Sequence, residues 1–212
     1  MKRSVATKTQ PRRTYRHGDL RRALLEAGIE LARAGGPEAV VLREATRRAG
    51  VVPNAAYRHF ASHQELLEGV RAAAFARVAE AMEAELAKLK PASPAEAARG
   101  SLRAVGAAYL RFAEKEPGLF RTAFALPQDV RGYARNAGRS GLTPFQLLSA
   151  ALDKMVAAGI LPPERRAGAE HLAWSAVHGF AMLVLEGPLH ALPPAQRRAI
   201  GERILAMVEQ GL

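Results

Sequence analysis

The stretch AGVVPNAAYRHF, residues 49–60, decides the fold. Gly50 suits a tight turn, and Pro53 is favoured in the first position of a helix, so a helix is expected over residues 53–60. Four hydrogen-bonding side chains lie on that short segment: Asn54, Tyr57, Arg58 and His59. The segment is therefore either a solvated surface helix or a helix that enters a nucleic-acid groove.

The residues before this stretch complete a small helical unit. A helix is expected over residues 42–49, ended by Gly50. An earlier helix is expected from Asp19, a plausible N-cap, because apolar residues recur at helical spacing: Leu20, Leu24, Ala27 and Leu31. Two short helices joined by a glycine turn have the size of a helix-turn-helix, whose second helix lies in the DNA major groove.

Helical periodicity continues to the end of the chain, and strand signals are nearly absent. Three N-cap signatures, Ser62 with Glu65, Ser93 with Glu96 and Thr143 with Gln146, mark helix starts. A short helix with Phe120 and Phe124 is expected after Pro117, and further helices at about 164–186 and 195–210, with a loop over 127–142. The prediction is an all-α protein of about nine helices, with a basic disordered arm (1–18), a three-helix helix-turn-helix domain (19–62) and a C-terminal helical domain (63–212).

Composition narrows the function classes. The 212 residues carry a net charge of +11, of which residues 1–60 hold 13 Lys and Arg against 5 Asp and Glu. This asymmetry indicates a basic N-terminal part that binds a polyanion. The alternative is a tail that only increases solubility. The chain has no cysteine, and its longest apolar stretch, residues 172–185, is shorter than the roughly 20 residues that span a bilayer. We expect a cytoplasmic protein, located at the nucleoid when bound to DNA, with no membrane contact.

The recognition segment has chemistry suited to double-stranded DNA. Asn54 can pair bidentately with adenine, and Ala55 and Ala56 are small enough for close approach to thymine methyl groups. Further donors suit phosphate oxygens. We therefore expect DNA contacts from nine residues: Arg16, Arg43, Pro53, Asn54, Ala55, Tyr57, Arg58, His59 and His63. Three alternatives stay open: Tyr57 packs on the first helix, His59 is an ordinary surface histidine, and Asn54 reaches only solvent or phosphate.

At this point the sequence resembles a known family. LLEAGIELARAGGPEAVVLREATRRAGVVPNAAYRHFASHQELLEGV, residues 24–70, is similar to the DNA-binding domain of TetR-family bacterial regulators, and WSAVHG, residues 174–179, resembles the Trp-His-Gly motif of one of its ligand-domain subgroups. The resemblance implies a homodimer, a two-fold symmetric operator and a ligand-sensing C-terminal domain.

The chain departs from the family pattern at three positions. Members usually carry Ser or Thr where Val41 and Val52 stand, and Lys where His63 stands. Each valine removes a helix cap, which typically costs about 1 kcal/mol, and a hydroxyl that could bind phosphate.

The C-terminal part suggests both a dimer interface and an effector pocket. Residues 172–185 are apolar nearly all round, so a helix there must be buried on more than one side, against its own domain and a partner copy. Aromatic residues and Met182 could line a pocket for a small hydrophobic effector: Tyr109, Phe112, Phe124, Phe145, Trp174, His178 and Met182. Ordinary core packing is the alternative for most of these. Gly179 suggests a close helix contact.

Catalysis and metal binding find no support in the sequence. His59 and His63 are separated by a helix break, and His171, His178 and Glu170 lack any recognised ligand spacing. The sequence indicates no cofactor and no enzyme. We expect a sequence-specific DNA-binding transcriptional regulator, a repressor modulated by a small molecule. The alternatives are an architectural DNA-binding protein without a ligand, and a small-molecule-binding or enzymatic helical protein with a basic head.

Overall fold

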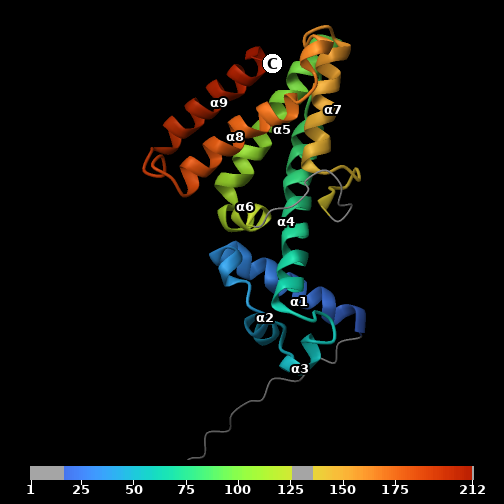
Figure 1. Ribbon diagram of the computed structural model, residues 1–212, viewed down its shortest axis with the longest axis vertical. Coiled ribbons are helices and arrows are strands. Elements are labelled where there is room, and N and C mark those ends of the chain that lie inside the picture. Colours follow the sequence, from blue (N-terminus) through green and yellow to red (C-terminus); the bar gives the residue numbers. More distant parts are fainter. Residues whose placement is uncertain (1–16, 126–135, 212) are drawn as a thin grey trace, which may run out of the picture.

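The computed structural model describes residues 17–125 and 136–211, and every regular element in these ranges is helical (Figure 1). The α-helices of this part are α1 (His17–Gly35), α2 (Leu42–Ala49), α3 (Pro53–Ala56), α4 (His63–Leu86), α5 (Pro94–Lys115), α6 (Pro117–Phe124), α7 (Pro144–Ala157), α8 (Ala169–Leu185) and α9 (Pro194–Gly211). Two 3₁₀ turns, η1 (Pro37–Ala39) and η3 (Pro163–Arg165), lie between them. The predicted all-α class is confirmed.

The predicted N-cap signatures form in the structure. Ser62 and Ser93 accept hydrogen bonds from the backbone N–H groups of Glu65 and Glu96, at 3.1 and 3.2 Å. At the start of α7, Thr143 and Gln146 make a reciprocal capping box. These short polar motifs satisfy backbone donors that no helical carbonyl can reach, so each fixes a helix start locally.

Three helix boundaries differ from the sequence prediction. Helix α1 begins at His17, so Asp19 lies inside its first turn; Gly18 costs a helix only about 1 kcal/mol and does not stop it. Helix α3 ends at Ala56 instead of residue 60, because the chain continues as a turn in which the Ala56 carbonyl accepts from His59 and Phe60. Helix α8 begins at 169 instead of 164, because Gly168 adopts a left-handed conformation.

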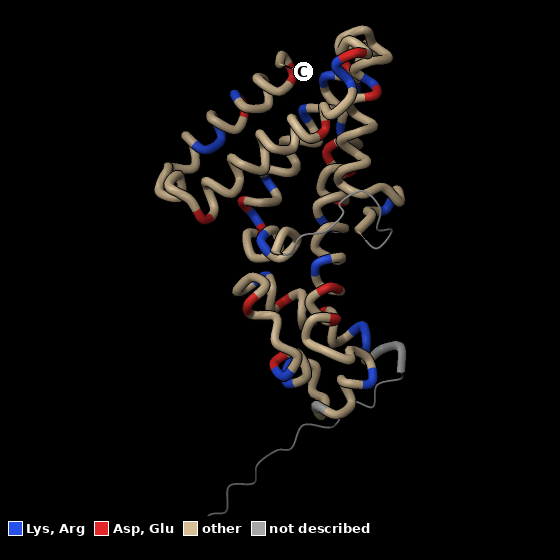
Figure 2. The backbone as a smooth tube through the Cα atoms, viewed as in Figure 1, with Lys and Arg blue, Asp and Glu red and all other residues tan. Residues whose placement is uncertain are grey.

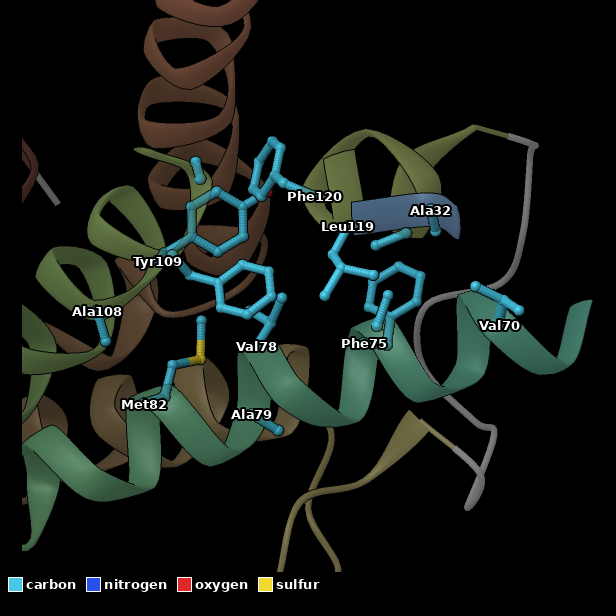
Figure 3. Packing of buried hydrophobic residues seen from close by; sticks show 14 of the residues in the cluster. Ala32, Val70, Phe75, Val78, Ala79, Met82, Ala108, Tyr109, Leu119 and Phe120 are labelled. Carbon is cyan, nitrogen blue, oxygen red and sulfur yellow. The ribbon is translucent and has the colours of Figure 1, made fainter. Parts of the chain in front are cut away.

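Helix α4 connects the two ends of the molecule (Figure 1). Its first half packs against α1, beside which α2 and α3 lie, and its second half packs against α5 and α7. Helix α6 contacts both α1 and α4. Figure 3 shows Leu119 of α6 beside Phe75 of α4, with Ala32 of α1 close by. All three are buried, so the apolar core runs without a break from one end to the other.

Helix α2 starts without a side-chain cap. Val41 occupies its N-cap with extended backbone angles (φ −109°, ψ 127°) and is 46% exposed. Replacing it with threonine should raise the free energy of unfolding by about 1 kcal/mol, because the hydroxyl would accept a hydrogen bond from the first turn. Urea denaturation measures the change. Val41→Ala is the matched control and should give no gain; equal stabilisation by both variants would contradict the capping explanation.

Candidate nucleic-acid interface and apolar pocket

A glycine turn sets the angle between α2 and α3. Gly50 adopts left-handed backbone angles (φ 70°, ψ 29°), and its N–H donates to carbonyls in the last turn of α2. The Val51 N–H donates to the Thr46 carbonyl at 3.1 Å. This pairing satisfies the carbonyls at the end of α2 and turns the chain sharply, in a conformation that any residue with a Cβ adopts only under strain.

Helix α3 is fixed to the rest of the unit by two buried residues. Ala56 and Phe60 are both fully buried. The Arg21 guanidinium of α1 lies 4.8 Å from the centre of the Phe60 ring, within cation–π range. Phe60 thus anchors the segment to α1. Because Ala56 faces this core, its predicted approach to a DNA groove is wrong.

The remaining side chains of the segment point outward. Asn54 and Arg58 are exposed, and Tyr57 is 58% exposed, so its ring is not packed on α1. Ala55 and His59 are half-buried, and Pro53 opens the helix. The segment 53–60 thus has an apolar side that faces the core and a polar side that faces outward.

The arginines of α2 differ in their surroundings. Arg47 and Arg48 both pair with Glu44, and these hydrogen bonds, that of Arg47 foremost, lower the pKa of the Glu44 carboxyl to about 2. Arg43 is exposed and outside this network. Of the three, Arg43 therefore remains the most available for an external anion, which agrees with its selection from the sequence.

Two further residues are predicted to contact DNA, His63 and Arg16. The His63 Nε2–H donates to the Val40 carbonyl, so this ring ties the start of α4 to the segment before α2. That contact joins residues 23 apart in the chain, which local sequence reasoning could not find. Arg16 lies outside the described residues.

Sequence reasoning missed Arg21. The residue is exposed on α1, yet the cation–π contact with Phe60 holds its charge beside the end of the α3 segment. Figure 2 shows further Lys and Arg on α2 and near the start of α1, at the end of the molecule that carries α3. A polyanion that met α3 would therefore find positive charge on both sides of it.

An apolar pocket of about 700 Å³, partly open to solvent, lies within the C-terminal helices. Its wall includes four of the predicted residues: Tyr109, Phe124, Phe145 and Trp174. Phe75 and Met82 of α4 and Val177 of α8 add to the apolar surface, and Arg103, Asn136 and Thr143 supply polar groups. The mostly apolar lining with a few polar groups is typical of a small-molecule site.

Three predicted pocket residues do not line this cavity. Phe112 is buried at a different place in the core, and Met182 lies one turn beyond His178 and packs on the core cluster. His178 lies behind the wall, with its ring centre 4.7 Å from that of Phe124. Spacing along a helix predicts which residues share a face, but not how far along that face a cavity extends.

Tyr109 accounts for the polar atoms of both Trp174 and His178. The Trp174 indole N–H donates to the Tyr109 hydroxyl at 3.1 Å, and that hydroxyl donates to His178 Nδ1 at 2.7 Å. Burial raises the pKa of the Tyr109 phenol and lowers the pKa of the His178 imidazole, so both groups stay uncharged. Tyr109, Trp174 and His178 thus form an uncharged hydrogen-bonded link between α5 and α8.

Glu83 of α4 holds the loop before α7. Its carboxylate accepts from the backbone N–H groups of Arg139 and Ser140 at 3.0 and 2.9 Å, and from the Ser140 hydroxyl. The same loop carries Asn136 and Thr143 to the pocket wall. The predicted loop over 127–142 is confirmed for its described residues from 137 onward; residues 126–135 lie outside the described part.

Helix α8 leaves one side uncovered. Leu172 is 65% exposed and Leu183 is 44% exposed, and Ser175 and Gly179 are exposed between them at helical spacing. Nothing within the described chain lies within 4 Å of a Cβ placed on Gly179, so the expected close helix contact at Gly179 is wrong within one subunit. Met207 of α9 is likewise 58% exposed.

The described residues contain neither a cluster of metal-ligating side chains nor a membrane-spanning helix. No group of three or more His, Cys, Asp or Glu in these ranges is placed to hold a metal ion. No described helix has the length and apolar character needed to cross a bilayer.

The Tyr109 link gives a stability prediction. Tyr109→Phe keeps the ring but leaves Trp174 Nε1 and His178 Nδ1 without their partner, so the free energy of unfolding should fall by about 1–3 kcal/mol. Urea denaturation measures the loss. Tyr57→Phe removes the same hydroxyl from an exposed site and should change stability by less than about 0.5 kcal/mol. Equal effects of the two variants would show that the link does not stabilise the fold.

Two family profiles match the sequence. Residues 24–81 match bacterial regulatory proteins of the tetR family, and residues 102–208 match the tetracyclin repressor-like C-terminal domain. No curated protein sequence matches the chain.

Solved structures of similar fold cover nearly the whole chain. A Rhodococcus sp. RHA1 protein of unknown function is 25% identical with a TM-score of 0.73, covering 93% of this chain and 97% of its own. The TetR-family regulator PfmR from Thermus thermophilus is 21% identical with a TM-score of 0.54, covering 89% and 98%. RolR, solved with resorcinol, is 16% identical with a TM-score of 0.58, covering 90% and 88%.

The two profiles together span the glycine turn, the α3 segment, the apolar pocket and the open side of α8. The chain therefore belongs to the TetR family of DNA-binding transcriptional regulators.

Proposed function

We propose that this protein is a homodimeric repressor that binds a two-fold symmetric operator and is released by a small hydrophobic effector. Residues 19–62 bind DNA, residues 63–212 bind the effector and dimerise, and the basic arm over residues 1–18 adds attraction to phosphate. One observation supports the proposal above all: in residues 53–60, Phe60 is buried in the core, whereas Asn54, Tyr57 and Arg58 are exposed.

The outward residues have separate roles in this proposal. Asn54 lies in the first turn of α3, the part of a recognition helix that faces base edges, and its amide pairs with adenine. Tyr57, Arg58 and the flanking Arg21 and Arg43 bind phosphate oxygens and so fix the register without reading sequence. The valines at both N-caps supply no hydroxyl, so these arginines carry more of the phosphate binding.

The open side of α8 supports a symmetric dimer. Its small and apolar residues, Leu172, Ser175, Gly179 and Leu183, let a second copy approach closely, and Met207 of α9 extends the same apolar character. Adjacent major grooves on one face of B-DNA are about 34–36 Å apart. Two recognition helices fit both grooves only if the dimer holds them at that separation.

Helix α6 provides a physical connection between pocket and DNA-binding unit. Phe124 lines the pocket, and Phe120 makes an edge-to-face contact with Tyr109 at 5.1 Å between ring centres. At the other end, a Cβ on Gly118 would collide with the Ala32 carbonyl of α1. Because α6 meets α1 backbone to backbone, an effector that displaces Phe124 also displaces α1 and the recognition element it carries.

An ion pair adds to this junction. Arg33 at the end of α1 donates to Glu116 beside the start of α6, at 2.8 Å. The RolR structure with resorcinol offers supporting precedent, because a protein of this fold holds a small aromatic molecule. The aromatic wall of the pocket here favours a neutral hydrophobic effector.

Competition binding distinguishes the repressor from an architectural protein that coats DNA without sequence preference. A regulator bound to its own operator should survive a thousandfold excess of random duplex, because specific binding exceeds non-specific binding by about 10³–10⁷. The operator is first selected from random duplexes by the full-length protein, and retention is then measured by fluorescence anisotropy. Complete loss to random duplex would support the architectural alternative.

Asn54 tests the base-reading role. Asn54→Ala should weaken discrimination at one operator position in each half-site by about 1–3 kcal/mol and leave the other positions unchanged. Arg58→Ala is the matched control from the same outward side and should weaken all duplexes about equally. Binding-site profiles of both variants measure the difference; an unaltered profile for Asn54→Ala would refute base contact by this residue.

A further inference from the structure

A second cavity adjoins the apolar pocket. It encloses about 750 Å³, partly open to solvent, where α5, α8 and α9 meet. Its floor is apolar, formed by Leu110, Phe180 and Val184 among others, and arginines and glutamates stand at its rim. We call this second cavity the outer groove and the first the inner pocket.

The two cavities follow one another along the same three helices. On α5, Gly106 lines the inner pocket and Ala107 lines the outer groove. On α8, Val177 lines the first and Ala181, one turn later, lines the second. Leu205 of α9 is the one described residue that lines both. The Leu205 side chain therefore lies where the two apolar spaces approach each other.

Leu205 occupies this position because α5 has a glycine opposite it. A Cβ on Gly106 would collide with Leu205 Cδ2. Leu205 is only partly buried, and leucine side chains exchange between staggered rotamers without movement of the backbone. Rotation of this one side chain away from Gly106 would change the boundary between the inner pocket and the outer groove.

We infer that Leu205 is a gate, and that the effector is a straight-chain amphiphile whose alkyl chain passes from the outer groove into the inner pocket. This inference rests on the proposed effector function of the inner pocket. An opening the size of one leucine side chain admits methylene groups in single file. The floor on both sides is apolar, which suits a chain that forms no hydrogen bonds.

The rim of the outer groove suits the polar head of such a molecule. Arg198, Glu114 and Glu202 are exposed there, and Arg111 is engaged with Glu85 at 2.9 Å. Charged groups of both signs keep this end hydrated, whereas most of the lining of the inner pocket is apolar. The head therefore remains at the rim while the chain extends inward.

The test uses the full-length protein and the fluorescent apolar probe N-phenyl-1-naphthylamine. Octanoate and tetradecanoate, and the alcohols 1-octanol and 1-tetradecanol, compete for the probe. Each methylene buried should increase affinity by up to about fourfold, so the tetradecyl compounds should bind at least a hundredfold more tightly than the octyl compounds. If affinity increases with alkyl-chain length for the acids but not for the alcohols, the protein does not recognise these ligands through their alkyl chains.

Two variants locate the chain. Val184→Trp fills the outer groove, through which both chains pass, and should weaken octanoate and tetradecanoate at least tenfold while leaving probe binding within twofold. Leu205→Ala opens the gate and should strengthen tetradecanoate several-fold. Ile204→Ala is the matched control, because Ile204 is also partly buried on α9 but lines neither cavity; it should change neither ligand.

The outcomes separate two kinds of failure. If the wild-type protein does not bind the probe, the inner pocket is not a ligand site, and the proposed effector function fails with it. If the probe binds but Val184→Trp leaves tetradecanoate unchanged, or Leu205→Ala does not strengthen it, the gate inference is wrong and the inner pocket stands. Retained probe binding by each variant shows that its inner pocket is folded.

Discussion

One long helix runs through both ends of a continuous hydrophobic core. Helix α4 has 24 residues and, at 1.5 Å per residue, is about 36 Å long. Its start packs Leu66 and Val70 against Gly28 of α1, and its middle places Phe75 and Met82 in the pocket wall. The pocket wall and the base of the DNA-binding unit therefore share one continuous helix. The contact of Gly118 with α1 adds a second connection, through α6.

Much of the fold was predictable because its signals are local. Ser62, Ser93 and Thr143 each satisfy backbone donors within one turn, so the helix starts they predict are confirmed. The left-handed turn at Gly50 is equally local. The end of α3 was predicted wrongly, because the last residues of that segment bond to Ala56 as a turn and are held by burial of Phe60, which depends on contacts with α1.

The pocket was predictable only in outline. Helical spacing brought Trp174 and His178 to one face, and their polar atoms do have a partner. That partner, Tyr109, is 65 and 69 residues away in the chain, and the link holds His178 behind the wall instead of in it. The contacts of Glu83 with the loop before α7 and of Arg21 with Phe60 also join distant segments. Such pairings depend on how helices pack, which no single-segment pattern encodes.

The α3 segment has a consequence for how such regulators diversify. Its anchoring residues, Ala56 and Phe60, and its outward residues, Asn54, Tyr57 and Arg58, are different sets. Exchange of an outward side chain leaves the buried contacts of Ala56 and Phe60 intact. The proposed readout and the anchoring of this short segment therefore depend on different side chains, so a change in one need not disturb the other.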